Sequence, residues 1–182
     1  MQNFTKKLIL IDQDQVLADF ELGFYRAVSK LREMSIKQIE LKDRNCFYAG
    51  DQYEKEQGLN TGYLAKEKDF FRKLPVIPGA IEGIKYLDSK YQVKIVTAPI
   101  LGARYCLQEK YDWILDNLGE SFCNKIIITQ DKTIIAGDYL IDDKPNIVGL
   151  MEPTWRHLLF ESCANKHLDM NRFSWKDIVD NF

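Results

Sequence analysis

Short apolar runs alternate along the chain with longer segments that have helical spacing. The apolar runs are rich in Ile, Leu and Val, and they lie at residues 7–11, 92–97, 125–129, 139–142 and 157–160. Continuous apolar runs of this length are typical of strands that are buried on both faces of a parallel sheet. Because helical segments separate these runs, the pattern predicts an α/β fold with a parallel sheet.

Three segments carry helical patterns outside the apolar runs. Residues 80–90 follow a Pro78–Gly79 turn and place three apolar side chains on one face, namely Ile81, Ile84 and Leu87. Residues 103–118 precede Gly119, a typical helix C-cap. Their apolar positions are Tyr105, Leu107, Tyr111, Ile114, Leu115 and Leu118. A closing helix is expected over residues 169–182, packed by Phe173, Trp175, Ile178 and Phe182.

The segment 20–74 interrupts this alternation. It is rich in charged and aromatic residues and in helix formers, notably at 22–34 and 52–57, and it has no strand pattern. We therefore expect a small helical cap over residues 20–74, inserted after the first strand. Residues 1–19 and 75–182 are expected to form the α/β core.

Composition and charge exclude several classes of protein. The chain has 182 residues, of which 46% are hydrophobic and 29% charged, as in an ordinary globular domain with a small insertion. A net charge of −2 argues against a nucleic acid polymer as partner, which would need a concentrated basic face. No apolar stretch approaches the length of a membrane span, and the four cysteines form no C-x-x-C pair. A cytoplasmic protein with reduced thiols is expected.

Polar residues follow the apolar runs where each predicted strand ends. The first run leads into Asp12 and Asp14, the second ends in Thr97, the third leads to Lys132, and the fourth ends in Asp142 and Asp143. In an open α/β sheet, ligands bind at the carboxyl ends of the strands. We therefore expect these side chains to meet at one edge of the sheet.

Such a set of residues is suited to phosphoryl transfer. Neighbouring carboxylates repel one another, and a divalent cation with a preference for oxygen ligands, such as Mg²⁺, relieves that repulsion. Asp12 is a candidate nucleophile, and Asp14 is a candidate general acid and base. Thr97 and Lys132 would hold phosphate oxygens, while Asp142 and Asp143 would hold the metal. Taken singly, each residue also fits a cap, a turn or a solvated position; their joint order along the chain favours the site.

The same residues resemble the motifs of a known superfamily. The segments IDQDQVLADF (11–20), VTAP (96–99), TQDK (129–132) and GDYLIDDK (137–144) resemble the four motifs of the haloacid dehalogenase superfamily. The longer stretches 70–80, 109–119, 125–147 and 157–168 look like segments of its 5'(3')-deoxyribonucleotidase family. The resemblance covers nearly the whole chain and is weakest over 21–69.

The resemblance implies a Rossmann-like core, Mg²⁺ dependence and hydrolysis of deoxynucleoside monophosphates through an aspartyl-phosphate. It implies that Asp12, the backbone carbonyl of Asp14 and Asp143 bind Mg²⁺, with Asp142 assisting through water. Phe20 and Phe47, with Tyr48 beside it, match aromatic positions of the family that sandwich the base. An apolar wall there leaves a ribose hydroxyl without a partner, which favours deoxy substrates. A homodimer is compatible with the resemblance.

The chain departs from the family pattern near the phosphate site. Gln15 stands where the family usually has Gly, Ala98 where it often has Ser, and Gln130 where it often has Arg. Gln13 occupies a variable, normally apolar position. Two other functions therefore stay open: a phosphatase for another small phosphate monoester, and a nucleotide-binding protein made catalytically weak by Gln15.

Overall fold

A five-stranded parallel sheet forms the centre of the molecule in the computed structural model, which describes residues 6–31 and 36–182. The strand order is β3-β2-β1-β4-β5. The strands are β1 (Leu8–Ile11), β2 (Gln92–Thr97), β3 (Ile126–Ile128), β4 (Tyr139–Asp142) and β5 (Arg156–Leu159). All four pairings are parallel, which confirms the predicted fold class. Each observed strand lies within about one residue of the expected run.

The strands bury side chains on both faces of the sheet. Ile9 and Ile11 belong to the larger core cluster, whereas Leu10 between them belongs to a smaller cluster on the other face with Trp155. Alternation of side chains along a strand explains why the run Leu8–Ile11 is apolar at every position.

Helices pack on the larger cluster and close the core. They are α3 (Ala80–Lys90), α4 (Cys106–Leu118), α5 (Glu120–Cys123) and α6 (Trp175–Asn181). The short helix η3 (Lys132–Ile134) lies between β3 and β4. Ile84 and Leu87 of α3 are fully buried, as expected from their spacing. The closing helix α6 is shorter than predicted, because Ser174 and Asp177 form a capping box that starts it at Trp175.

Helix α4 presents a different face to the core from the one its apolar residues indicate. Its buried residues are Cys106, Glu109, Lys110, Trp113, Ile114 and Leu118. Tyr105, Leu107, Tyr111 and Leu115 are instead between 39% and 46% exposed. The physical reason is that two charged residues, Glu109 and Lys110, occupy the buried face and have hydrogen-bond partners there.

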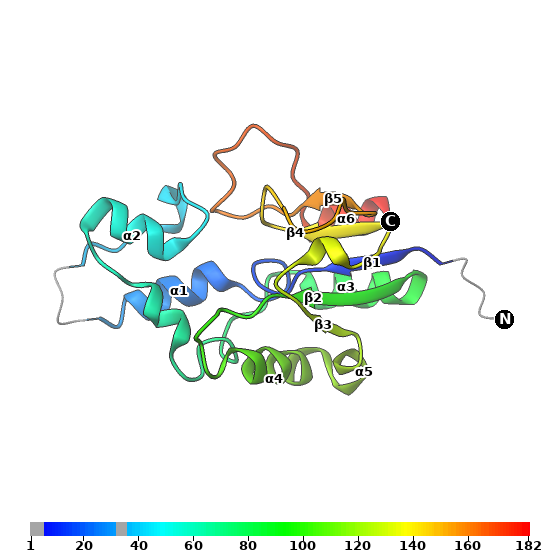
Figure 1. Ribbon diagram of the computed structural model, residues 1–182, viewed down its shortest axis with the longest axis horizontal. Coiled ribbons are helices and arrows are strands. Elements are labelled where there is room, and N and C mark those ends of the chain that lie inside the picture. The colour runs from blue at the N-terminus through cyan, green and yellow to red at the C-terminus, as the bar shows by residue number, and fades with distance from the viewer. Residues whose placement is uncertain (1–5, 32–35) are drawn as a thin grey trace.

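The segment between β1 and α3 folds as helices beyond the carboxyl ends of the strands (Figure 1). It contains α1 (Phe20–Val28), η1 (Leu41–Asp43), α2 (Ala49–Gln57) and η2 (Gly62–Lys66), and its described part has no strand. These helices share a small core of their own, made of Phe24, Val28, Ile39, Ala49, Tyr53 and Leu64. Helix α1 ends earlier than the expected 22–34, and Met34 lies outside the described residues.

The returning chain of this segment is tied to α4. The indole Nε1 of Trp113 donates to the carbonyl of Leu74 at 2.8 Å, and the carboxylate of Glu109 accepts from the backbone N–H of Phe71 at 3.1 Å. Among the described helices, none is long and apolar enough to cross a membrane.

Candidate active site

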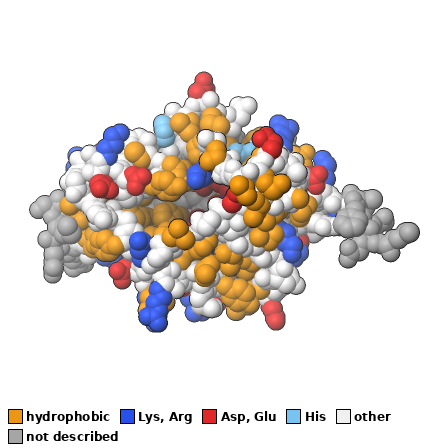
Figure 2. All heavy atoms as spheres, in the orientation of Figure 1, with side chains coloured by type: hydrophobic (Ala, Val, Ile, Leu, Met, Phe, Trp, Pro, Cys, Tyr) orange, Lys and Arg blue, Asp and Glu red, His pale blue; other side chains and the backbone are white. Residues whose placement is uncertain are grey.

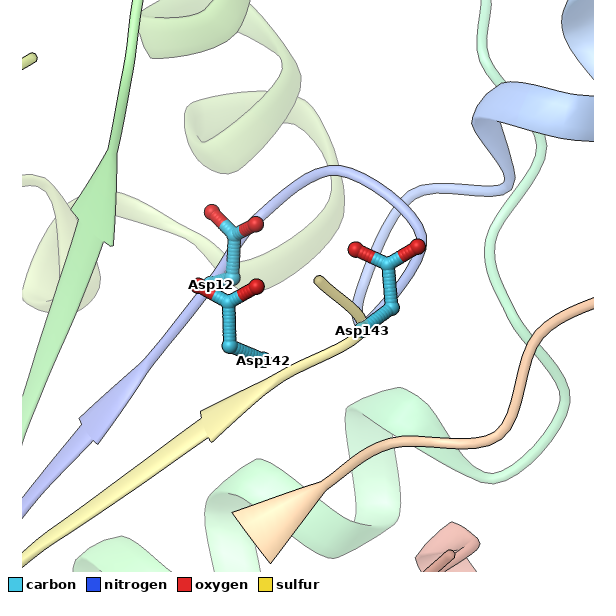
Figure 3. Close-up of side chains that lie close together, drawn as sticks. All are labelled: Asp12, Asp142 and Asp143. Carbon is cyan, nitrogen blue, oxygen red and sulfur yellow. The ribbon is translucent and has the colours of Figure 1, made fainter. Parts of the chain in front are cut away.

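Three carboxylates share one space at the carboxyl end of the sheet. Asp12 directly follows β1, Asp142 ends β4, and Asp143 comes next in the chain. Because β1 and β4 are neighbours in the sheet, their ends lie side by side. One oxygen from each of these carboxylates lies within 4.8 Å of the others, and Figure 3 shows the three side chains converging. The structure therefore brings together acids that lie up to 131 positions apart in the sequence, as predicted from their places at the ends of strands.

Lys132 bridges two of these acids. Its Nζ lies 2.7 Å from Asp12 Oδ1 and 2.6 Å from Asp142 Oδ2. The lysine reaches the site from η3, which Asp131 caps by accepting from the backbone N–H of Thr133. Although burial works against its charge, Asp12 and Asp142 raise the pKa of Lys132. Lys132 is therefore a fixed cation beside the candidate nucleophile.

Burial also changes the ionisation of the acids. Loss of water raises the pKa of Asp12 to about 7, against the attraction of Lys132, and the charges of Asp142 and Asp14 add to the rise. Burial and the neighbouring Asp142 and Asp12 raise the pKa of Asp143 well above its usual range. Ionisation of all three acids at once is therefore disfavoured, because the bridging lysine does not balance three negative charges.

The donor set fits a hard divalent cation. Three carboxylates face one ammonium, so this group carries a formal charge of −2 when all its members are ionised. The available ligand atoms are all oxygens, which suit Mg²⁺ rather than a softer metal. Asp142 already accepts from Lys132 and from the backbone N–H of Lys144, which is consistent with a less direct role than that of Asp12 and Asp143.

Asp14 points to a different partner. Its Oδ2 accepts from Nζ of Lys110 at 2.6 Å, and the same Nζ lies 2.8 Å from Thr97 Oγ1 and 2.8 Å from the carbonyl oxygen of Ala98. Lys110 is 2% exposed and comes from α4. Sequence reasoning missed this residue. The sequence signal that could have found it is its spacing: Lys110 lies four residues after Cys106, and therefore on the same, buried face of α4.

A cavity of about 390 Å³ lies in front of these residues. Its floor includes Asp12, Asp14, Lys132 and Asp143, and its walls include Ala98 and Gln130. Thr97 is 1% exposed and does not line the cavity, because its hydroxyl faces Lys110. Figure 2 shows the hollow with hydrophobic side chains around it. A volume of this size is typical of a small-molecule site.

The predicted aromatic residues line the same cavity. Phe20, Phe47 and Tyr48 all border it, and Tyr48 is 56% exposed. Phe47 and Tyr48 meet edge to face, with ring centroids 5.0 Å apart. Phe20 also packs on Phe70, with centroids 5.4 Å apart, so it has a structural contact besides its place in the wall.

A buried ion pair positions the segment that carries Phe47. Arg44 Nε lies 2.6 Å from Glu21 Oε2, and both side chains are nearly inaccessible to solvent. The same guanidinium donates to Gln52 and to the carbonyl of Phe47. Glu21 itself lines the cavity beside Phe20. Nothing local in the sequence pairs Glu21 with Arg44, so sequence reasoning missed both.

Gln15 adopts the backbone conformation that the usual glycine would favour. Its φ is +59°, in the left-handed region. Its side-chain Oε1 accepts from the backbone N–H of Glu21 at 2.9 Å, and therefore satisfies one free donor at the start of α1. The glutamine thus offsets its backbone strain with a helix-capping contact.

Replacing Gln15 by Gly should therefore change little. Relief of the left-handed strain, about 1–2 kcal/mol, opposes the lost cap contact and the added chain entropy, each about 0.5–1 kcal/mol. We expect the free energy of unfolding to change by less than about 1 kcal/mol and turnover to stay within about threefold. Urea unfolding and steady-state kinetics measure both. A tenfold or larger gain in turnover would instead support the catalytically weak binding protein.

The remaining departures lie between two loops at the cavity. Gln130 Nε2 donates to the carbonyl of Pro99 at 2.5 Å and so links the loops that follow β2 and β3. Ala98 contributes its carbonyl to Lys110 and offers no hydroxyl to a ligand. The structure thus gives Gln130 a loop-bracing contact at the position where the family often has Arg.

Comparison with known proteins extends over almost the whole chain. The model of the family described as "5' nucleotidase, deoxy (Pyrimidine), cytosolic type C protein" matches residues 6–182. The mitochondrial 5'(3')-deoxyribonucleotidase of Mus musculus is 39% identical in an alignment of 187 positions that covers 94% of this chain and 84% of that protein. The cytosolic type of Homo sapiens is 37% identical in an alignment of 180 positions that covers 93% of this chain and 89% of that protein.

A solved structure shares the fold at low sequence identity. A haloacid dehalogenase-like hydrolase from Burkholderia xenovorans matches with a TM-score of 0.50 and 14% identity, covering 96% of this chain and 95% of that one. The family match and the extent of the similar relatives confirm the resemblance seen in the motifs. Its fold is that of a haloacid dehalogenase-like hydrolase, and this chain belongs to the 5'(3')-deoxyribonucleotidase family.

Proposed function

We propose that this protein is a Mg²⁺-dependent phosphatase that hydrolyses deoxynucleoside monophosphates to nucleoside and phosphate. One observation carries the proposal: the same cavity is lined by carboxylates and Lys132 from the strand ends and by Phe20, Phe47 and Tyr48 from residues 20–74. The charged residues suit a phosphate group and the aromatic rings suit a base. Residues 20–74 would act as the cap and residues 1–19 and 75–182 as the core.

Asp12 is the proposed nucleophile. Its carboxylate oxygen forms a bond to phosphorus, the bond from phosphorus to the nucleoside oxygen breaks, and Asp14 gives a proton to that oxygen. Lys132, 2.7 Å from Asp12 Oδ1, stabilises the negative charge on the phosphoryl oxygens during transfer. The product of this step is the free nucleoside and an aspartyl-phosphate on Asp12.

The second step restores the enzyme. Asp14, now ionised, takes a proton from water, and the resulting hydroxide attacks phosphorus so that the bond to Asp12 breaks. Phosphate leaves, and Asp14 holds a proton for the next cycle. The metal would be held by Asp12, the carbonyl of Asp14 and Asp143, with Asp142 acting through water. Mg²⁺ bound there would neutralise phosphate charge.

Mg²⁺ binding should weaken as pH falls through about 7. Without metal, burial raises the pKa of Asp12 to about 7, so this ligand is protonated below that pH and a cation must displace the proton. We expect Kd to rise by roughly tenfold or more per pH unit below 7, because burial also raises the pKa of Asp143, a second proposed ligand. Titration calorimetry at pH 6 and pH 8 measures the difference. A Kd independent of pH would contradict this ligand assignment.

The cap residues should decide the substrate. Replacing Phe47 by Ala is expected to lower kcat/KM for deoxynucleoside monophosphates by about 10–100-fold, because stacking of a base on an aromatic ring is worth about 1–3 kcal/mol. Glycerol phosphate has no base, so its kcat/KM should not change. Steady-state kinetics with both substrates test the proposal.

Tyr63 provides a matched control for this experiment. It is an aromatic residue of the same segment, is exposed and does not line the cavity. Tyr63→Ala should leave both substrates unaffected. If Phe47→Ala changes the two substrates equally, the base does not stack there, and a phosphatase for another small phosphate monoester becomes the better account.

Location and assembly stay predictions within this proposal. A cytoplasmic location is supported by the cytosolic type among the relatives, although another relative is named mitochondrial. A homodimer stays a prediction.

A further inference from the structure

Lys110 is a buried lysine that the proposed mechanism does not use. It lies on α4, is 2% exposed and does not line the cavity. A lysine this deeply buried needs partners for its charge and for its three N–H donors. Because it does not face the cavity, it is not placed to touch a substrate.

The Lys110 ammonium has three close acceptors. These are Asp14 Oδ2 at 2.6 Å, Thr97 Oγ1 at 2.8 Å and the carbonyl of Ala98 at 2.8 Å. Three donors meet three acceptors, so the ammonium is satisfied in one orientation. The acceptors come from the loop after β1 and from the end of β2, and Lys110 therefore joins two strand exits to α4.

The main chain at Lys110 is held as well. The buried side chain of Gln13 donates from Nε2 to the carbonyl of Lys110 at 2.9 Å. The preceding residue, Glu109, accepts from the backbone N–H of Asp69 at 2.5 Å and of Phe71 at 3.1 Å, where the segment 20–74 returns to the core. This turn of α4 is therefore fixed through Gln13 to the loop after β1, and through Asp69 and Phe71 to the end of the proposed cap.

The Asp14 carboxylate has one oxygen occupied by this contact. Oδ2 is held by Lys110, whereas Oδ1 is buried and has no hydrogen-bond partner among the described residues. An aspartate on a loop can rotate about two side-chain torsions, and general acid catalysis requires the group to stay within hydrogen-bond reach of the leaving oxygen. A fixed ion pair behind the carboxylate removes that freedom.

We propose that Lys110 is a positioning residue for the reaction, which holds the Asp14 carboxylate in its proton-transfer orientation and braces it against Thr97 and the carbonyl of Ala98. This inference rests on the proposed function, because it takes Asp14 as the general acid and base. Lys110 acts through Asp14 and does not bind the phosphate itself.

The test compares leaving groups. In Lys110→Met, kcat for a deoxynucleoside monophosphate should fall by about 100-fold with KM within about threefold, because acid–base catalysis contributes about 10²–10⁴-fold. The first turnover of para-nitrophenyl phosphate, followed by stopped-flow absorbance, should stay within about threefold, since nitrophenolate leaves without a proton. Lys110→Met in an Asp14→Asn background should cause no further loss.

Two further variants complete the design. Lys125 pairs with Asp88 at the opposite, amino end of β3, so Lys125→Met removes a similar lysine–aspartate pair away from the cavity and should leave the kinetics unchanged. Lys110→Arg keeps the positive charge, but a planar guanidinium cannot point a donor at each of the three acceptors. We therefore expect a kcat between those of the wild type and Lys110→Met. If circular dichroism shows that Lys110→Met does not fold, Lys110→Arg carries the test.

Several results would overturn the inference. A loss confined to KM would make Lys110 a binding group, and equal losses in the first turnover of both substrates would make it merely structural. An additive loss in the double variant, or wild-type kcat in Lys110→Arg, would also contradict it. A failure of the proposed function would give a different result: the wild type would hydrolyse para-nitrophenyl phosphate and glycerol phosphate but no nucleotide. Glycerol phosphate would then replace the nucleotide when Lys110→Met is compared on the two leaving groups.

Discussion

Replacing Asp12 by Asn is expected to lower the turnover of deoxynucleoside monophosphates by at least about 10⁴-fold, because an amide oxygen cannot form the acyl-phosphate bond. The fold should be retained, since Asn is nearly isosteric and can still accept from Lys132. Nucleotide binding should also persist, because Lys132 and the aromatic wall are unchanged. Phosphate release measures the first expectation and titration calorimetry the second.

Asp19 provides the matched control for this substitution. It belongs to the same loop but caps α1, where its Oδ1 accepts from the backbone N–H of Leu22 at 2.9 Å. Asn is as good an N-cap as Asp, so Asp19→Asn should preserve both stability and turnover. Near-normal turnover in Asp12→Asn would show that another group attacks phosphorus.

Replacing Lys132 by Met is expected to lower both activity and stability. Turnover should fall by about 10³-fold, because a fixed cation is lost from the phosphoryl group. Without Mg²⁺, the free energy of unfolding should fall by about 3–5 kcal/mol at pH 8, because Asp12 and Asp142 lose their shared partner in a buried site. Urea unfolding with and without Mg²⁺ measures the loss, and Mg²⁺ should recover part of it.

The sign of the pH dependence provides a separate check on Lys132→Met. A carboxyl group whose pKa is raised in the folded state makes the fold less stable as pH rises from its unfolded value, near 4, to its folded value. For Asp12, that window ends at about 7 even with Lys132 present. The stability loss in Lys132→Met should therefore be smaller at pH 5 than at pH 8.

Lys73 shows how an exposed pair should differ. It lies 2.9 Å from Asp69 Oδ2, one turn away, and most of its side chain is in solvent. Lys73→Met should change the free energy of unfolding by less than about 0.5 kcal/mol. A comparable loss in the two variants, or no loss in Lys132→Met, would mean that Lys132 does not compensate the buried acids.

The sheet and the acidic residues at its edge could be predicted because their signals are local. The run Leu8–Ile11 is apolar at every position, and Asp12 ends it abruptly. The same transition occurs where β4 reaches Asp142 and Asp143. Since parallel strands end at one edge, these breaks in hydrophobicity are enough to place the carboxylates together.

Helix α4 could not be oriented in this way. Hydrophobic residues lie on both of its sides, and Tyr111 and Leu115 are on the side that faces solvent. Glu109 and Lys110 are buried because each meets partners from distant parts of the chain: the backbone at Asp69 and Phe71 for Glu109, and Asp14 for Lys110. The spacing of hydrophobic residues does not reveal which distant groups will form hydrogen bonds with a charged residue.

The contacts within residues 20–74 are equally non-local. Glu21 and Arg44 are 23 positions apart and belong to different elements, so no spacing rule pairs them. Gln15 is the opposite case. Its place at the family's usual glycine is visible in the sequence, but its left-handed backbone and the compensating contact to Glu21 depend on how α1 begins.

The most direct test of the proposed function is phosphate release from a matched pair, a deoxynucleoside monophosphate and its ribonucleotide, with Mg²⁺ and with a chelator. We predict Mg²⁺-dependent release that is faster from the deoxynucleotide, because the rings of Phe20 and Phe47 offer no hydrogen-bond partner to a 2'-hydroxyl. Release only from aryl or sugar phosphates would contradict the assignment of a nucleotide substrate, but it would still support a phosphatase mechanism at Asp12. Release that persists in the chelator would contradict the metal site of Asp12, Asp142 and Asp143.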